Sequence, residues 1–298
     1  MTLLTRLGLG TAQFGHHYGI SNRGGPPTAQ EIASILRHAA AAGIGYIDTA
    51  PAYGNAEELL GRQMPTQHRF RIVTKAPKII DEAISKDHAQ VILDSVARSL
   101  ERLRIDRVYA VIVHDADDLR KAGWEHVVEA LRRAKERGWA TRIGASIYDA
   151  EQLALVESRF RPELIQLPLN ALDRRMAACG ALDRLKAFGI EVHARSSFLQ
   201  GMLLMDVAEL PEFFSSLRRP LAELHARWAA EGMTSLAGCL DFVLQQKAVD
   251  AVIVGVNCGA ELDGIIAAVN RARFVNPGDA LAVDPGLLDP RRWPALVQ

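Results

Sequence analysis

The chain has 298 residues, and its 35 lysines and arginines are balanced by 35 aspartates and glutamates. This balance gives no electrostatic reason to expect nucleic acid or an anionic membrane as a partner. Hydrophobic residues make up 49% of the chain, which is ample for a large buried core. The segment 1–9 lacks the apolar stretch of a signal peptide and no later run approaches a membrane span, so we expect a cytoplasmic protein.

Eight short, mostly apolar runs alternate with amphipathic helical patterns along the chain. Strands are predicted at residues 6–11, 45–48, 71–74, 108–113, 142–145, 164–167, 191–194 and 251–256. Helical patterns between them include residues 29–42, 89–103, 127–137, 150–158, 181–188 and 235–246. Continuous apolar strands are typical of buried parallel sheets, and eight such units suit a closed barrel better than a doubly wound sheet. The sequence therefore predicts an α/β fold, a single (β/α)8 TIM barrel with eight parallel strands.

We expect one barrel domain over residues 1–298, because no linker, low-complexity tract or shift in composition divides the chain. Segment 205–219 is the least regular, and the tail from about residue 284 has too many prolines for a long helix. Gly8, Gly10 and Gly15 have the wrong spacing for the G-x-G-x-x-G turn of a Rossmann unit. The three cysteines, at 179, 239 and 258, are too scattered for a disulfide framework or a Cys-x-x-Cys metal site.

Four polar residues follow consecutive predicted strands, at the end of a barrel where active sites are found. Asp48 ends the second strand and Tyr53 follows it, while Lys75 and His114 come directly after the third and fourth strands. Singly, each has an ordinary structural role, because aspartate caps helices, tyrosine packs and lysine is usually solvated. Their occurrence together at consecutive strand ends favours a catalytic set.

The chemistry of this set is coherent. A carbonyl that accepts hydride develops negative charge on its oxygen, which calls for a proton donor and a hydrogen-bond donor. Tyrosine has an ordinary pKa of about 10, so we expect the Lys75 ammonium to lower the pKa of Tyr53. Asp48 would pair with Lys75 and hold it, and His114 would donate a hydrogen bond to the carbonyl oxygen.

The segment 43–61, GIGYIDTAPAYGNAEELLG, resembles the first signature of the aldo-keto reductase family, and Lys75 and His114 then follow in that family's order and spacing. The resemblance covers nearly the whole chain. It implies hydride transfer between NAD(P)(H) and the carbonyl or alcohol carbon of a small aldehyde, ketone or sugar. It also implies that Tyr53 is the general acid, assisted by Lys75 and Asp48, and that His114 polarises the carbonyl.

The resemblance extends to the cofactor site. Ser146 and Gln166 resemble the polar groups that hold the nicotinamide carboxamide, and Asn170 resembles an asparagine that follows that glutamine in many relatives. Many relatives have an aromatic residue where this chain has Arg195. The charge of Arg195 would disfavour the oxidised nicotinamide ring. Arg195 is therefore also a candidate to bind an anionic group of the substrate or the cofactor. The residues expected at the cofactor are Asp48, Ser146, Gln166, Arg195, Ser196, Phe198, Gln200, Gly201, Gly255, Asn257 and Glu261.

The preference between NADP(H) and NAD(H) stays open. Gly255 and Glu261 occupy positions where NADP-selective relatives have a lysine and an arginine that grip the 2′-phosphate. A carboxylate is unfavourable beside that phosphate but can accept a hydrogen bond from a free 2′-hydroxyl. A helix beginning near Gly259 would direct free N–H groups at a phosphate.

The substrate is expected to contact Gln13, Phe14, His16, Tyr53 and His114. The adjacent histidines His16 and His17 lack a third ligand, so we expect no metal. The expected partner is a small carbonyl compound or sugar, neither nucleic acid nor a membrane, and the chain is expected to be a monomer or a weak homo-oligomer.

Two other functions remain open on the sequence. In a barrel aldolase, Lys75 would form a Schiff base with its substrate. In a non-catalytic role, the barrel would keep the cofactor as a redox sensor or partner subunit. The aldolase interpretation leaves Ser146, Gln166 and the predicted phosphate loop after the last strand without a purpose.

Overall fold

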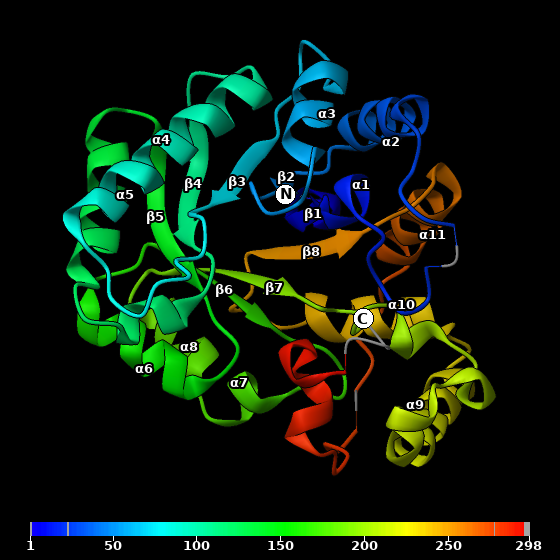
Figure 1. Ribbon diagram of the computed structural model, residues 1–298. Helices are drawn as coiled ribbons and strands as arrows, with labels where there is room; N and C mark the ends of the chain where they lie inside the picture. Colours follow the sequence, from blue (N-terminus) through cyan, green and yellow to red (C-terminus); the bar gives the residue numbers. More distant parts are fainter. Residues whose placement is uncertain (1, 23, 277, 295–298) are drawn as a thin grey trace.

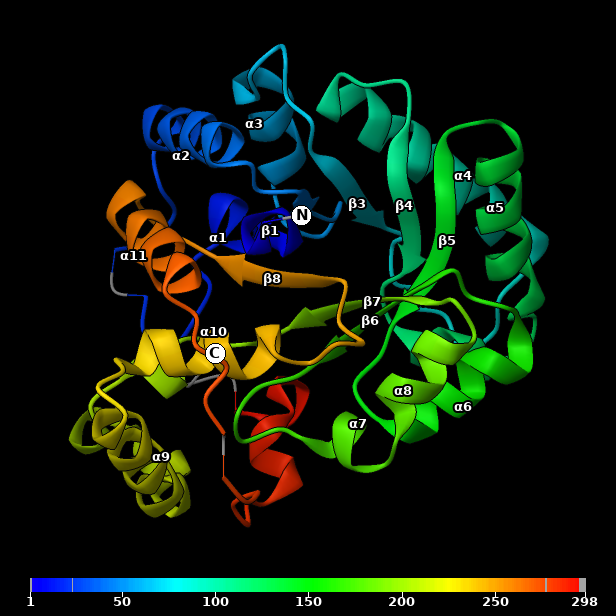
Figure 2. The same cartoon turned by 180° about the vertical axis from the view of Figure 1, so that it is seen from behind.

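The computed structural model describes residues 2–22, 24–276 and 278–294, and its eight parallel strands close into a barrel in sequence order. Helices surround the barrel on all sides (Figures 1 and 2). The predicted (β/α)8 TIM barrel is confirmed. The strands are β1 (Leu7–Gly10), β2 (Tyr46–Asp48), β3 (Arg71–Lys75), β4 (Val108–Val113), β5 (Ala140–Ser146), β6 (Leu164–Pro168), β7 (Glu191–Arg195) and β8 (Ala251–Gly255).

The helices differ widely in length. They are α1 (Ala12–Gly15), α2 (Ala29–Ala42), α3 (Ala56–Gln63), α4 (Lys86–Leu103), α5 (Glu125–Glu136), α6 (Ala150–Arg159), α7 (Arg175–Ala178), α8 (Ala181–Ala187), α9 (Arg218–Ala230), α10 (Ser235–Leu244) and α11 (Gly259–Asn270). Local capping sets several of these bounds. The helix predicted at 89–103 begins at Lys86 because Ser85 and His88 form a reciprocal capping box. The α2 helix has its predicted bounds and ends at Gly43, whose φ of 80° is the left-handed conformation that glycine adopts easily.

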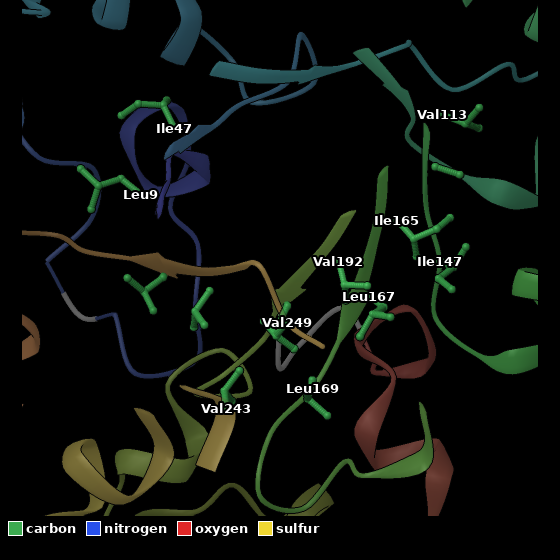
Figure 3. Packing of buried hydrophobic residues seen from close by; sticks show 14 of the residues in the cluster. Leu9, Ile47, Val113, Ile147, Ile165, Leu167, Leu169, Val192, Val243 and Val249 are labelled. Carbon is green, nitrogen blue, oxygen red and sulfur yellow. The ribbon is translucent and has the colours of Figure 1, made fainter. Parts of the chain in front are cut away.

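Side chains alternate between the two faces of each strand. Outward residues such as Leu9, Ile47 and Val113 pack against the surrounding helices in the main core (Figure 3). Separate clusters fill the barrel interior, one built on Val73, Ala110, Ile112 and Leu164 and another on Tyr46, Ala251 and Ile253. The interior is therefore packed with side chains, and the residues that end β2, β3, β5 and β7 lie at the mouth of the barrel.

The C-terminal tail returns to the barrel. After Asp284 it forms two short 3-10 turns, Pro285–Leu288 and Pro290–Arg292, rather than a long helix. Leu287, Leu288 and Trp293 are buried, and the Trp293 ring meets Phe214 edge-on at 4.9 Å between centroids. The tail thus covers the region beside β6 and β7 (Figures 1 and 2).

Candidate active site

One pocket of about 480 Å³ opens at the carboxyl ends of the strands. Because the strands are parallel, their carboxyl ends all meet at this mouth. Tyr53, Lys75, His114 and Gln13 line it, and so do all the residues expected at the cofactor: Asp48, Ser146, Gln166, Arg195, Ser196, Phe198, Gln200, Gly201, Gly255, Asn257 and Glu261. Residues from seven of the eight strands and from the loops after them share this cavity.

Asp48 and Lys75 form a buried ion pair at the floor of this pocket. Lys75 Nζ donates to Asp48 Oδ2 at 2.7 Å and to the Thr49 carbonyl at 2.9 Å, and the residue is 2% exposed. The other carboxylate oxygen, Oδ1, accepts from Gln166 Nε2 at 2.7 Å. Burial lowers the pKa of Lys75, and the Asp48 charge opposes that change. The expected pairing of Asp48 with Lys75 is confirmed, whereas the bond from Gln166 was not foreseen.

Tyr53 and His114 lie together above this pair. Their rings meet edge-on with centroids 6.0 Å apart, and Lys75 Nζ lies 4.9 Å from the Tyr53 centroid. Burial, reinforced by the Asp48 charge, raises the pKa of Tyr53. The expectation of a lowered tyrosine pKa is therefore wrong for the protein without a ligand, because desolvation of the phenolate and the nearby carboxylate outweigh the cationic groups. Burial and the Lys75 charge lower the pKa of His114 to about 4, which leaves its imidazole neutral at pH 7.

The cofactor half of the pocket has the features that a dinucleotide needs. Ser197 is buried, lines the pocket and carries a hydroxyl with no partner among the described residues. Ser196, Leu199, Gln200 and Gly201 all have positive φ, so the loop after β7 turns tightly along the pocket wall. The α11 helix begins at Gly259, as expected, but the Gly259 N–H is not free, because it donates to Glu31 Oε1 at 2.8 Å. Ala260, in the same first turn, lines the cavity. This donor set fits a phosphate-bearing ligand.

The family model of the aldo/keto reductase family matches residues 6–276. The chain belongs to this family. An L-galactose dehydrogenase of Arabidopsis thaliana is 24% identical over 98% of this chain and 94% of its own length. A D-threo-aldose 1-dehydrogenase of a Pseudomonas species is 27% identical over 82% of this chain and 86% of its own length. The solved glycerol dehydrogenase of Gluconobacter oxydans has a TM-score of 0.68 at 22% identity, covers 94% of this chain and 96% of its own, and supports the fold.

This aldo/keto reductase is accordingly an oxidoreductase enzyme. Within residues 2–22, 24–276 and 278–294, no group of three or more His, Cys, Asp or Glu side chains could hold a metal ion. Over the same residues, each helix is too short or too polar to cross a bilayer.

Phe14 and His16, both expected at the substrate, lie elsewhere. Phe14 is 1% exposed in the main core, because the short α1 helix turns its ring inward. His16 is exposed, contacts the Ala52 carbonyl at 2.8 Å and does not line the pocket. The backbone at Gly15 explains this path, since a Cβ there would lie 1.8 Å from the Tyr53 carbonyl oxygen. The segment before His16 is thereby pressed against the loop of Tyr53 rather than into the cavity.

The nucleotide end carries a polar network that joins three segments. Glu261 Oε2 accepts from the Asn257 backbone N–H at 2.7 Å, and Asn257 Oδ1 accepts from Asn22 Nδ2 at 3.0 Å. Gly255 leaves room for the Gln13 amide, because a Cβ on Gly255 would meet Gln13 Nε2 at 2.0 Å. A lysine at position 255 would therefore displace Gln13. Asn22 thus links the segment after β1 to the segment after β8.

Two buried polar residues hold the architecture behind the pocket. Asn170 Oδ1 accepts from the backbone N–H groups of Leu172 and Asp173, and its Nδ2 donates to the Ser196 carbonyl, so it caps a loop and supports the one after β7. It does not line the pocket. Glu57 is 1% exposed and accepts from Thr74 Oγ1 at 2.7 Å and from Arg102. Glu57, which lies in the signature segment 43–61, thus links α3 to β3 and α4.

Proposed function

We propose that this aldo/keto reductase transfers a hydride between the nicotinamide of NAD(P)(H) and the carbonyl or alcohol carbon of a small aldehyde, ketone or sugar, with Tyr53 as general acid and base. The convergence of Asp48, Tyr53, Lys75 and His114 on one pocket carries the proposal. The sugar dehydrogenases among the relatives support sugars and their aldehydes within this range.

The protein groups divide the work on the substrate oxygen. In reduction, the Tyr53 hydroxyl donates its proton to the carbonyl oxygen, and the neutral His114 imidazole donates a hydrogen bond to the same atom. The raised pKa of Tyr53 keeps it protonated, and therefore ready as an acid, at neutral pH. As the proton leaves, the Lys75 ammonium stabilises the phenolate, and Asp48 holds Lys75 in place. In alcohol oxidation the same groups act in reverse.

Members of the family use a nicotinamide dinucleotide, which when bound supplies or accepts the hydride. Ser146 and Gln166 would hold its carboxamide, since Gln166 Nε2 is already bound to Asp48 and its carbonyl oxygen remains to accept. The loop of Ser196, Phe198, Gln200 and Gly201 would follow the pyrophosphate, together with the first turn of α11. Asn257, Glu261 and Gly255 would lie beside the adenosine ribose.

The aldolase alternative is less well supported. Schiff-base formation needs a neutral amine that can reach a carbonyl. Lys75 Nζ instead donates to Asp48 and the Thr49 carbonyl, and its side chain is 1% exposed. Both interactions would have to break before the amine could attack.

Replacing Tyr53 by phenylalanine tests the proposal. Because the variant keeps the ring and loses the transferable proton, we expect NAD(P)H-linked carbonyl reduction to fall by about 100-fold or more. Cofactor affinity, measured by quenching of NADH or NADPH fluorescence, should stay within about threefold. The substrate panel should include aldoses, aliphatic aldehydes and ketones, in both directions and with both cofactors.

Tyr109→Phe is the matched control, since its hydroxyl binds Glu191 at the opposite end of the barrel. Turnover should be retained there. Wild-type turnover in the Tyr53→Phe variant would remove Tyr53 from the acid role.

A further inference from the structure

Arg195 is a charged residue that lines the pocket, and no acidic side chain in the described part of the chain pairs with it. It ends β7, is half-buried and lines the cavity together with Tyr53 and His114. Among the described residues it makes no ion pair; its Nη2 donates to the Ile147 carbonyl at 3.1 Å and its Nη1 to Ser196 Oγ at 3.3 Å. Other N–H groups of the guanidinium thus remain free for a ligand.

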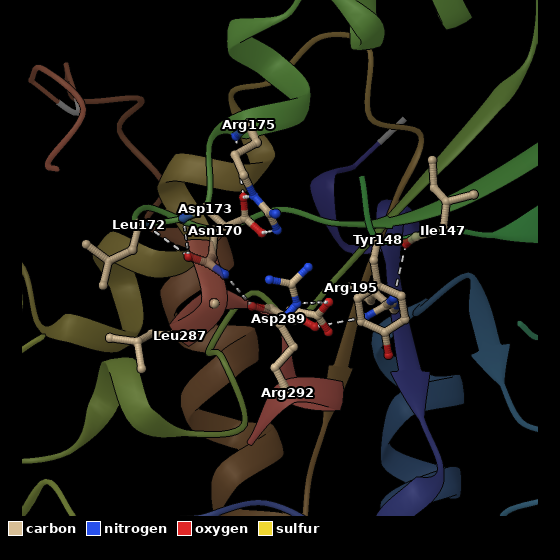
Figure 4. Close-up of polar contacts among 12 residues, drawn as sticks. Ile147, Tyr148, Asn170, Leu172, Asp173, Arg175, Arg195, Leu287, Asp289 and Arg292 are labelled. Carbon is tan, nitrogen blue, oxygen red and sulfur yellow. Dashed lines mark hydrogen bonds and ion pairs between the residues drawn. The ribbon is translucent and has the colours of Figure 1, made fainter. Parts of the chain in front are cut away.

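The guanidinium is held in position by an aromatic ring. Its Cζ lies 4.0 Å from the centroid of Tyr148, which also lines the pocket (Figure 4). Arg291, from the C-terminal tail, lies 3.8 Å from the same centroid. Both guanidinium groups therefore pack on the Tyr148 ring. Arg291 pairs with Asp289 at 2.7 Å, whereas none of the described carboxylates pairs with Arg195.

A partly desolvated cation without a counter-ion is unfavourable, and an anionic ligand relieves that cost. The oxidised nicotinamide ring is itself cationic and cannot serve. The residues proposed for the cofactor's phosphates lie in the loop after β7, from Ser196 to Gly201, and in the first turn of α11. The Arg195 guanidinium instead reaches the segment after β5, at the Ile147 carbonyl and the Tyr148 ring, and there it shares the cavity with Tyr53 and His114. Its anion therefore belongs at the catalytic end of the pocket.

We propose that Arg195, held by Tyr148, binds an anionic group of the substrate, so that the preferred substrates are short carbonyl compounds carrying a carboxylate or a phosphate. This inference rests on the proposed carbonyl reduction at the same pocket. A guanidinium suits either group because its planar N–H fork matches two oxygens of a carboxylate or phosphate.

Binding of an unreactive anion tests the inference without turnover. Calorimetry would compare succinate, ethyl phosphate and the uncharged succinamide, with the chain alone and with reduced cofactor present. Succinate or ethyl phosphate should bind the wild type, and Arg195→Gln should weaken that binding by about 10- to 100-fold. Arg195→Lys should bind with intermediate affinity, and succinamide should not respond to either change. Arg62→Gln, on the exposed face of α3, is the matched surface control and should behave as the wild type.

Kinetics then assign the effect to the substrate. In Arg195→Gln, kcat/KM for succinic semialdehyde should fall by about 10- to 100-fold relative to kcat/KM for butanal, with NAD(P)H affinity within about threefold. An equal loss for both aldehydes, tenfold weaker cofactor binding, or anion binding that ignores Arg195 would overturn the inference. Failure of the proposed function is distinct: the wild type would then reduce no carbonyl with NAD(P)H, whatever the succinate titration gives.

Discussion

Tyr53 and His114 have pKa values that move in the directions suited to their proposed roles. Burial raises the pKa of the tyrosine and lowers the pKa of the histidine to about 4, so both are uncharged at neutral pH. An uncharged tyrosine retains the proton that reduction consumes, and an uncharged imidazole still donates one hydrogen bond. Asp48 and Lys75 form an ion pair beneath them. The site is thus prepared for reduction before any ligand binds.

The two reaction directions should therefore differ in pH dependence. Below the raised pKa of Tyr53 the acid form predominates, so kcat/KM for carbonyl reduction should be flat between about pH 6 and 9. Alcohol oxidation needs the phenolate, whose fraction rises tenfold per pH unit below its pKa, so its kcat/KM should rise across the same range. Initial rates in both directions would check this. An oxidation profile that levels off near pH 7 would contradict the raised pKa.

Glu261 offers a test of cofactor choice. Its carboxylate faces the pocket and would repel a 2′-phosphate, so Glu261→Arg should improve NADPH binding relative to NADH by about tenfold. The same carboxylate also accepts the Asn257 N–H, so Glu261→Gln is the control that removes the charge but keeps an acceptor. Fluorescence titration of both cofactors would give the ratio. An unchanged ratio of NADPH to NADH affinity in the Glu261→Arg variant would show that Glu261 does not distinguish the two riboses.

At the scale of elements, the C-terminal tail contributes to the pocket from outside the barrel. Arg291 stacks on Tyr148 and pairs with Asp289, while the buried Trp293 packs on Phe214. The Tyr148 ring, on which Arg195 packs, is therefore also held by the C-terminal tail, a segment far away in sequence. Substitutions in the tail should then act on substrate binding without touching the catalytic residues.

Arg291→Gln is the direct test of this coupling. Loss of one cation–π contact, worth about 0.5–1 kcal/mol, should weaken succinate binding by about two- to fivefold through looser placement of Tyr148 and Arg195. Butanal turnover should be unaffected. Arg292→Gln, whose side chain is 68% exposed on the same turn, is the control. Equal effects of the two substitutions would mean that the tail acts only through its general stability.

The elements that are best predicted from the sequence are those set by local hydrophobic periodicity and by local turn and capping residues. The strands and α2 follow from apolar runs and from glycines such as Gly43, and the catalytic set follows from its positions at strand ends. Phe14 and His16 were misplaced because the short α1 helix reverses which side chains face the cavity. The packing of Arg291 on Tyr148 could not be predicted from the sequence, because it depends on where the C-terminal tail returns to the barrel. The raised pKa of Tyr53 depends on burial, which sequence does not give.

Across the whole molecule, the barrel interior has three levels. The mouth carries the pocket, apolar residues such as Val73 and Ile253 fill the middle, and a polar cluster closes the opposite end. There Glu191 accepts from Tyr46 at 2.9 Å, from Tyr109 at 2.6 Å and from His193 at 2.9 Å. The middle layer separates this carboxylate from the catalytic groups, so the closed end bears on stability and the mouth on chemistry.

Because of Glu191, the free energy of unfolding should fall as the pH becomes acidic. Burial raises its pKa, but the hydrogen bond and charge of His193 and the tyrosine hydroxyls outweigh burial and lower the pKa to about 2. A depressed pKa contributes stability that is full above the unfolded value near 4.5 and is lost as pH falls toward 2. The contribution is about 3 kcal/mol, so Glu191→Gln should lower the denaturation midpoint at pH 7. In this variant the midpoint should also change less with pH below about 4.5 than in the wild type. Parallel acid profiles of the two proteins would instead place the acid sensitivity in other carboxylates.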